Sequence, residues 1–188
     1  CGEGGYSREL AAAGARVYSV DSSSFFIEYA AEKALEECLD IRHFVRNSDD
    51  LYGIPEESFD RVLCSMMLMD CEDLQGTLRE IMRVLKPGGK LVASVLHPCF
   101  YGKEITWSGD DTEKKVTVED YFHPVLWERA LYKDVDKPVI WRHRTLQDYV
   151  KAFVACGFSV TDLTEPIPTQ NQIKKFPGLV WLQKIPLF

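Results

Sequence analysis

The stretch Glu80-Ile81-Met82-Arg83-Val84-Leu85-Lys86-Pro87-Gly88-Gly89-Lys90-Leu91 joins two elements of different periodicity. Before it, apolar residues recur at helical spacing and form one face of a helix: Leu74, Leu78, Ile81, Met82 and Leu85. The Lys-Pro-Gly-Gly turn stops this helix, because proline lacks a backbone N–H and glycine favours other conformations. Residues 90–96 then form a compact apolar run that is typical of a buried strand. The chain therefore changes from helix to strand at this turn.

The same alternation extends in both directions. Strands are predicted at residues 15–20, 41–45 and 59–67, and helices at 6–13 and 22–38, the second helix burying Phe26, Ala30 and Ala34. Farther on, Thr145 and Asp148 resemble a capping box, and strands are expected at 158–163 and 179–188. Short strands that alternate with helices predict a mainly parallel sheet with helices on both faces.

Composition narrows the class of protein. The chain has 188 residues, of which 46% are hydrophobic and 27% charged, and its net charge is −7. Its apolar runs are too short to cross a bilayer, and it has no dense Lys/Arg cluster of the kind that binds nucleic acid. The six cysteines have neither Cys-x-x-Cys nor zinc-finger spacing. We therefore expect a single cytoplasmic domain, 1–188, that acts on a small molecule without a metal, a membrane or nucleic acid.

A glycine-rich turn, Cys1-Gly2-Glu3-Gly4-Gly5, precedes the first predicted helix. Glycines let the backbone approach a ligand closely, and the helix N-terminus presents N–H groups to it. Asp21 ends the next strand, so in a doubly wound sheet it lies beside this turn and can bind both hydroxyls of a ribose. Its alternative role is to cap the following helix, although the adjacent serines can do so instead. The turn and the acid together predict a nucleoside-binding site.

Three segments, in order and at matching distances, resemble class I S-adenosylmethionine-dependent methyltransferases, in particular the methyltransferase type 11-like domains. The glycine turn with Tyr-Ser-Arg-Glu-Leu resembles motif I, Gly-x-Gly-x-Gly, whose first glycine would precede Cys1. The segment Ile-Pro-Glu-Glu-Ser-Phe-Asp-Arg-Val-Leu at 54–63 resembles the stretch leading into the family's fourth strand. The segment 80–91 resembles its junction with the fifth strand.

The resemblance covers residues 1–96 and implies a fold. This is a Rossmann-like three-layer α/β/α sandwich, with a mostly parallel seven-stranded sheet that includes one antiparallel strand. The first strand of that sheet would be missing from this chain, which we interpret as a fragment of a longer one.

The resemblance also implies residues that bind S-adenosylmethionine. Gly2 and Gly4 would pass close to its methionine part. Asp21 would hold the ribose hydroxyls, with the adjacent Ser22 counted in the same site.

Two further positions of the cofactor site follow by counting from Asp60. Twelve residues before it, where the family places an acidic or amide residue on the adenine amino group, stands Ser48, with Asp49 next to it. Both stay candidates. Five residues after Asp60, Ser65 would line the cofactor pocket at the end of the fourth strand.

Methyl transfer from a sulfonium needs alignment more than covalent help, and a base only if the acceptor must lose a proton. Residues 97–144 lie where the family inserts substrate-recognition elements, and their aromatic side chains suit an apolar or cationic acceptor, or else form a satellite core. His97 and Asp70, each directly after a strand, are the candidate catalytic residues. Their alternative roles are structural hydrogen bonding for His97 and helix capping for Asp70. His143 is a weaker candidate.

The sequence thus predicts a methyltransferase that acts on a small-molecule acceptor, and it leaves two alternatives. A nicotinamide-dependent dehydrogenase would need Gly-x-Gly-x-x-Gly, but Tyr6 stands two residues after Gly4 and the third glycine is misplaced. A non-catalytic methyltransferase-like binding domain stays open, because Ser48 departs from the family pattern. Neither the acceptor atom nor the oligomeric state is indicated.

Overall fold

The computed structural model describes residues 1–103, 105–111, 113–129 and 139–188. The chain divides into two compact units, each treated by itself. The first comprises Cys1–Val62 and Asp73–Lys90, and the second comprises Leu63–Glu72 and Leu91–Phe188. Two strands, β3 (Phe59–Ser65) and β4 (Leu85–Ser94), pair with each other and contribute residues to both units.

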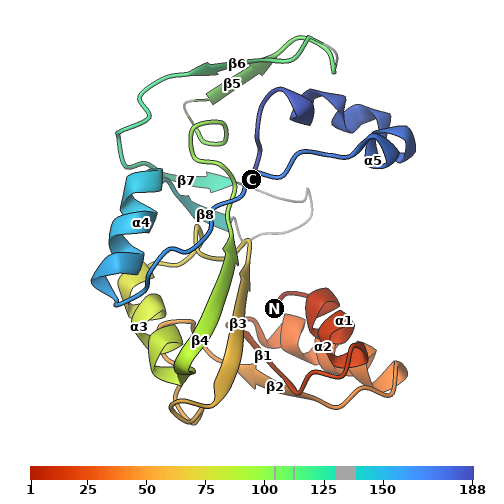
Figure 1. The fold of residues 1–188 in the computed structure, drawn as a ribbon, viewed down its shortest axis with the longest axis vertical. Coiled ribbons are helices and arrows are strands. Elements are labelled where there is room, and N and C mark those ends of the chain that lie inside the picture. Colours follow the sequence, from red (N-terminus) through yellow and green to blue (C-terminus); the bar gives the residue numbers. More distant parts are fainter. Residues whose placement is uncertain (104, 112, 130–138) are drawn as a thin grey trace. The chain divides into compact units, whose positions relative to one another are not determined.

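The first unit begins with a parallel strand pair and two helices. β1 (Val17–Asp21) pairs with β2 (Ile41–Val45) in a register that runs from Val17 opposite Ile41 to Asp21 opposite Val45. The helices α1 (Gly5–Ala12) and α2 (Ser24–Glu36) pack against this pair (Figure 1). All four elements lie within two residues of the predicted ranges.

The buried face of α2 differs from the predicted one. Ile27, Ala30 and Ala34 are buried, whereas Phe26 is 43% exposed. Residues spaced by three and then four positions stay on one helix face, but repeated spacings of four drift around the axis. Ile27, not Phe26, therefore continues the buried stripe.

The fold-deciding stretch forms α3 (Leu74–Val84) followed at once by β4. Asp73 caps α3 by accepting a hydrogen bond of 2.7 Å from the Gly76 N–H, and the buried residues of this helix include Leu78 and Ile81. The strand begins at Leu85, five residues earlier than predicted. It does so because the N–H groups of Glu57 and Ser58 donate to the carbonyls of Arg83 and Val84, so strand-like pairing starts before the glycines.

The core of the first unit lies between α3 and the strands. Leu51, Ile54 and Val84 are buried there, and the partly buried residues that pack against them come from β1, β2 and β3: Val20, Phe44, Phe59 and Val62. β1, β2 and β3 thus supply side chains to one shared core.

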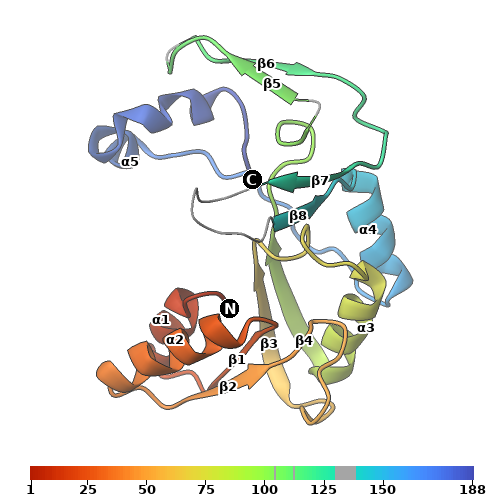
Figure 2. The ribbon, with the colours of Figure 1, turned by 180° about the vertical axis from the view of Figure 1, so that it is seen from behind.

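The second unit holds two antiparallel hairpins that the sequence did not predict. One pairs β5 (Ile105–Ser108) with β6 (Lys115–Val118), and the other pairs β7 (Leu126–Arg129) with β8 (Val139–Arg142). Figure 2 shows β7 and β8 next to the helix α4 (Leu146–Ala155). The predicted capping box of α4 is confirmed, since Thr145 and Asp148 bond each other's backbone N–H groups.

The strands expected near the C-terminus are wrong. Residues 158–163 are irregular, and the segment after them forms α5 (Gln170–Lys175) and a 3₁₀ helix, Pro177–Gln183. The ring of Trp181 in this 3₁₀ helix packs against Trp107 of β5 at 4.9 Å. This tertiary contact outweighs a β propensity that is weak without a partner strand.

In the described residues the strands pair two by two, as β1–β2, β3–β4, β5–β6 and β7–β8. The seven-stranded sheet and the single-domain organisation stay predictions. No helix in the same residues has the length and apolar character that a membrane span requires.

The Lys-Pro-Gly-Gly stretch, which lies within β4, generates a test of the fold. A Cβ at Gly89 would lie 2.8 Å from the Lys86 carbonyl oxygen and 3.2 Å from that of Phe59, so Gly89→Ala should destabilise the protein by about 1–3 kcal/mol. Gly5→Ala is the control, because no heavy atom lies within 4 Å of its Cβ position. Urea denaturation should show lower stability for Gly89→Ala alone. Equal stability of the two variants would contradict the described packing.

Candidate functional site

The glycine turn is shaped by backbone conformations that suit glycine. Gly4 has a φ of +76°, and a Cβ there would lie 2.8 Å from the Cβ of Ala30 on α2. Glycine therefore allows the turn to pack directly on the helix. Gly2 also has a positive φ, of +54°, and its N–H donates to the carboxylate of Asp21 at 2.8 Å.

Asp21 ends β1 and points to this turn, as the doubly wound topology predicts. Its Oδ2 accepts hydrogen bonds from the Gly2 N–H and the Cys1 amino group, and its Oδ1 accepts one of 3.0 Å from the Ser23 N–H. Burial raises the pKa of this carboxyl. The bonds from the amino group, Ser23 and Gly2 outweigh that effect and hold the pKa below its usual value. Asp21 is therefore an ionised acceptor beside the glycine turn.

These residues fit the nucleoside part of S-adenosylmethionine. A carboxylate offers about four acceptor positions, and the described residues occupy three of those on Asp21, which leaves one on Oδ1. The side chain is 19% exposed, so a ribose hydroxyl can reach it. The capping role belongs to Ser23, whose side chain accepts from the Phe26 N–H, while Ser22 is exposed beside Asp21.

Ser48 and Asp49 lie on a loop that α3 holds in place. Glu80 accepts the Leu51 N–H at 2.9 Å, and Arg83 donates to the carbonyls of Leu51 and Ile54. The Ser48 hydroxyl lies 2.8 Å from the hydroxyl of Thr77, a fully buried residue of α3, and the Asp49 side chain is exposed. The two candidates thus face different surroundings. No pattern in the sequence predicts the contact between Ser48 and Thr77.

In the second unit, two arginines hold the segment that follows β3. Arg142 donates to the Asp70 carbonyl at 2.8 Å, and Arg144 donates to the carbonyls of Leu68, Cys71 and Glu72. No pattern in the sequence predicts this role for the two arginines. Their role depends on tertiary contacts across more than seventy residues of chain.

Asp70 carries an exposed side chain on that segment. Partial desolvation raises the pKa of its carboxyl to about 6, and the charges of Arg142 and Arg144 counteract this only in part. The helix cap that was its alternative role is made by Asp73. Ser65, the last residue of β3, is half-buried.

His97 has both ring nitrogens engaged. Its Nδ1 accepts the Cys99 N–H at 3.2 Å, so the ring proton lies on Nε2, which is 3.0 Å from Glu165 Oε1. Its backbone N–H donates to the Leu187 carbonyl, and the ring is buried against Phe100. This geometry is typical of a structural histidine that anchors the C-terminal segment.

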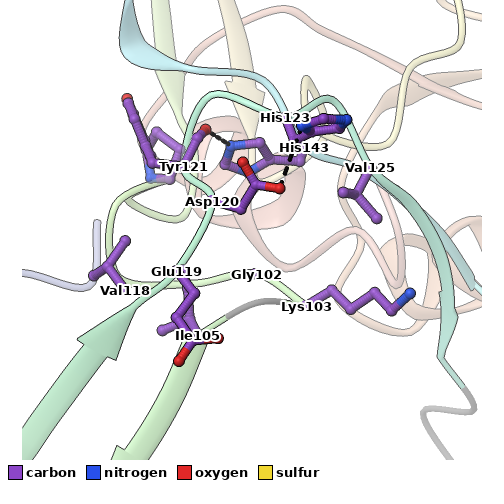
Figure 3. A pocket seen from close by; sticks show the side chains of 11 residues that line it. Gly102, Lys103, Ile105, Val118, Glu119, Asp120, Tyr121, His123, Val125 and His143 are labelled. Atoms are coloured by element: carbon purple, nitrogen blue, oxygen red, sulfur yellow. Dashed lines mark hydrogen bonds and ion pairs between the residues drawn. The ribbon is translucent and has the colours of Figure 1, made fainter.

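Two hollows lie in the aromatic-rich region, and both include Pro98 and His143 in their walls. One, a space of about 270 Å³ that is open to solvent, is lined by residues of 98–103, by Ile105 and by residues of 118–125 (Figure 3). The other, of about 260 Å³, has aromatic walls and borders the segment after β3; its lining includes Met69, Tyr101, Trp141 and Tyr149. Other aromatics pack on each other, as Trp107 and Trp181 do. The region therefore combines a satellite core with open hollows.

Comparisons with known proteins show the family of the first half of the chain. Residues 1–93 match the family model of the methyltransferase domain. A crystal structure of an S-adenosylmethionine-dependent methyltransferase from Mesorhizobium loti has a TM-score of 0.83 to this chain, with 26% identity, covering all of this chain and 84% of that one. Residues 1–93 belong to the methyltransferase domain family. The fold of this methyltransferase domain is Rossmann-like.

Curated relatives of the methyltransferase domain act on different kinds of atom. A ubiquinone biosynthesis O-methyltransferase from Xanthomonas oryzae is 35% identical over 97 residues, which are 52% of this chain and 41% of that protein. A sterol 24-C-methyltransferase from Gibberella zeae is 36% identical over 91 residues, which are 47% of this chain and 24% of that protein. The chain thus spans less than half the length of these relatives.

The raised pKa of Asp70 generates a test of the protein's stability. Between its usual pKa of 3.8 and about 6, the folded protein holds a proton at Asp70 that the unfolded chain releases, so the free energy of unfolding falls as pH rises. Asp70→Asn should be free of this loss, and its stability relative to wild type should be higher at pH ~7 than at pH ~4. Because the side chain is exposed, the effect is small. A difference between the two proteins that does not change with pH in denaturant titrations would refute the assignment.

Proposed function

We propose that this protein transfers the methyl group of S-adenosylmethionine to a small-molecule acceptor. One observation carries the proposal: an ionised Asp21, held by the N–H groups of Gly2 and Ser23, stands beside a turn that has no side chain at Gly2 or Gly4. The turn lets a ligand approach the backbone, and the carboxylate binds hydroxyl groups. This combination suits a nucleoside that carries a flexible, polar extension.

Each part of the cofactor has a candidate partner in the first unit. Gly2 and Gly4 line the methionine part, and Asp21 binds the ribose with Ser22 beside it. Asp49, not Ser48, binds the adenine amino group, because an amino group donates hydrogen bonds and an exposed carboxylate accepts them. The Ser48 hydroxyl serves the contact between the loop and Thr77. Ser65, the last residue of β3, stays a predicted residue of the cofactor site.

The bound cofactor supplies a methyl group that its positive sulfur activates. The chain's own contribution is to bind and orient, since alignment of two reactants can lower the barrier by about 7–11 kcal/mol. Asp21 and the glycine turn fix the nucleoside end. Arg142 and Arg144 fix the backbone of the segment after β3, next to the aromatic hollow.

Residues 97–144 recognise the acceptor, which is a small molecule and not nucleic acid. Asp70, ionised at pH ~7 because its pKa is about 6, contributes negative charge on the acceptor side. His97 acts as a positioning residue through Glu165 and Leu187. We place the reaction in the cytoplasm and assign the chain to a single methyltransferase domain that needs no metal.

Isothermal titration with S-adenosylhomocysteine tests the cofactor site. Asp21→Asn keeps the shape of the side chain but loses its charge and one acceptor oxygen. Since a hydrogen bond to a charged group contributes about 1.5–3 kcal/mol, the affinity should fall about 10- to 100-fold.

Asp60→Asn is the matched control, because Asp60 is an exposed aspartate of the same unit that pairs with Lys86. It should bind like wild type. Unchanged affinity in Asp21→Asn would overturn the proposed cofactor site.

A further inference from the structure

We propose that Arg8 is a positioning residue of the cofactor site, and that it gives this site its preference for a nucleoside with an amino-acid extension over one without it. Arg8 does so by fixing one peptide unit in the middle of the glycine turn. The inference rests on the proposed function and adds the residue that shapes the turn for the methionine part. All the residues that carry it lie in the first unit.

The peptide unit between Glu3 and Gly4 is held at both of its polar ends. Its carbonyl oxygen, that of Glu3, accepts a hydrogen bond of 2.6 Å from Nη1 of Arg8. Its N–H, that of Gly4, donates to the Cys1 carbonyl at 3.1 Å. Because a peptide unit is planar, bonds at its two opposite ends fix the orientation of the whole unit. The centre of the turn is therefore held in one conformation.

The guanidinium group of Arg8 is held in turn by α2. Its Nε pairs at 2.8 Å with Oε1 of Glu37, the residue directly after α2, which lies beside α1 (Figure 1). The backbone N–H of Arg8 donates to the Gly4 carbonyl at 3.0 Å and so begins the hydrogen bonding of α1. The Arg8 side chain is only 19% exposed. Its position is thus set by both helices.

The turn needs such an external contact because of its glycines. Gly2 and Gly4 have positive φ angles, which glycine adopts without strain, but glycine also has the largest conformational freedom to lose. A Cβ at Gly4 would lie 3.4 Å from Nη1 of Arg8, so the missing side chain lets the guanidinium pack directly on the turn. Arg8 therefore restricts a segment that has no large side chain of its own to restrict it.

Different groups hold the two ends of the proposed cofactor site. The carboxylate of Asp21, proposed for the ribose, is held by the N–H groups of Gly2 and Ser23. Arg8 holds the peptide before Gly4, on the side proposed for the methionine part. Loss of the Arg8 contact should thus loosen the turn and leave Asp21 with its hydrogen bonds. A ligand that reaches along the turn would lose affinity, and a shorter one would not.

The shape of the guanidinium matters here more than its charge. Glu37 already neutralises that charge, and two different nitrogens of one planar group bind Glu37 and the Glu3 carbonyl. Lysine carries a single nitrogen on a flexible chain and cannot reproduce both bonds in this arrangement. Arg8→Lys therefore keeps the charge and loses the fixed position.

Isothermal titration with two ligands tests the preference. S-adenosylhomocysteine carries the amino-acid extension, whereas 5′-methylthioadenosine keeps the nucleoside and the sulfur without it. In Arg8→Lys the affinity for S-adenosylhomocysteine should fall about 10-fold, the lower end of what a hydrogen bond to a charged group contributes. The affinity for 5′-methylthioadenosine should stay close to that of wild type, which also shows that the variant is folded.

Two further variants complete the experiment. Lys33→Met is the matched control, because Lys33 pairs with Glu36 within α2 at 2.8 Å, and it should keep both affinities. Glu37→Ala removes the anchor of Arg8 from a half-exposed position. It should lower the affinity for S-adenosylhomocysteine alone, because the guanidinium then loses its fixed orientation.

The two affinities separate the outcomes. If wild type binds S-adenosylhomocysteine and the preference is unchanged in Arg8→Lys and Glu37→Ala, the role of Arg8 is wrong and the methyl-transfer proposal stands. Equal losses for both ligands would also refute that role. If wild type binds neither ligand, the methyl-transfer proposal is overturned, and the inference about Arg8 with it.

Discussion

The first unit depends on the hydrogen bonds that backbone N–H groups donate to the carboxylate of Asp21. A carboxylate that is four-fifths removed from solvent is costly unless N–H groups surround it, and here the glycine turn and the start of α2 supply them. The same bonds join three elements at one point: the turn before α1, the end of β1 and the N-terminus of α2. Asp21 is thus both the proposed ligand-binding residue and the residue that connects these three elements. The turn tolerates no side chain at Gly4, because α2 passes there at contact distance.

In the second unit, two arginine side chains hold a loop by hydrogen bonds to its backbone carbonyls. The guanidinium groups of Arg142 and Arg144 donate to backbone carbonyls within residues 68–72. These bonds take the place of the backbone pairing that a strand or helix would provide, and they hold the loop in one conformation. Fixed loops matter to a transfer reaction, because a small misplacement of the reactants costs much of the gain from alignment. The aromatic hollow beside this loop and the hollow of Figure 3 share Pro98 and His143.

Local patterns in the sequence predicted most of the first unit. The spacing of apolar residues located α1, α2 and α3, the Thr145–Asp148 pair located α4, and topology alone placed Asp21 beside the glycine turn. The hairpins β5–β6 and β7–β8 could not be predicted in this way, because four-residue strands carry too little periodicity and their stability comes from the partner strand.

The residues of the candidate site could be predicted only where a short stretch of sequence determines their position. The Ser48–Thr77 bond joins residues 29 positions apart, and the orientation of His143 depends on a backbone carbonyl 22 positions away. No local pattern records such contacts. The strand expected at 179–188 failed for the same reason, since Trp107 gives Trp181 a partner that the sequence does not reveal.

The most direct measurement of the central claim is a crystal structure of the protein with S-adenosylhomocysteine. The account predicts that the ribose hydroxyls bind the Asp21 carboxylate, that the methionine part follows Gly2 and Gly4, and that the adenine amino group lies on Asp49. A nucleoside bound away from Asp21 would contradict the account, whatever else the crystal contained.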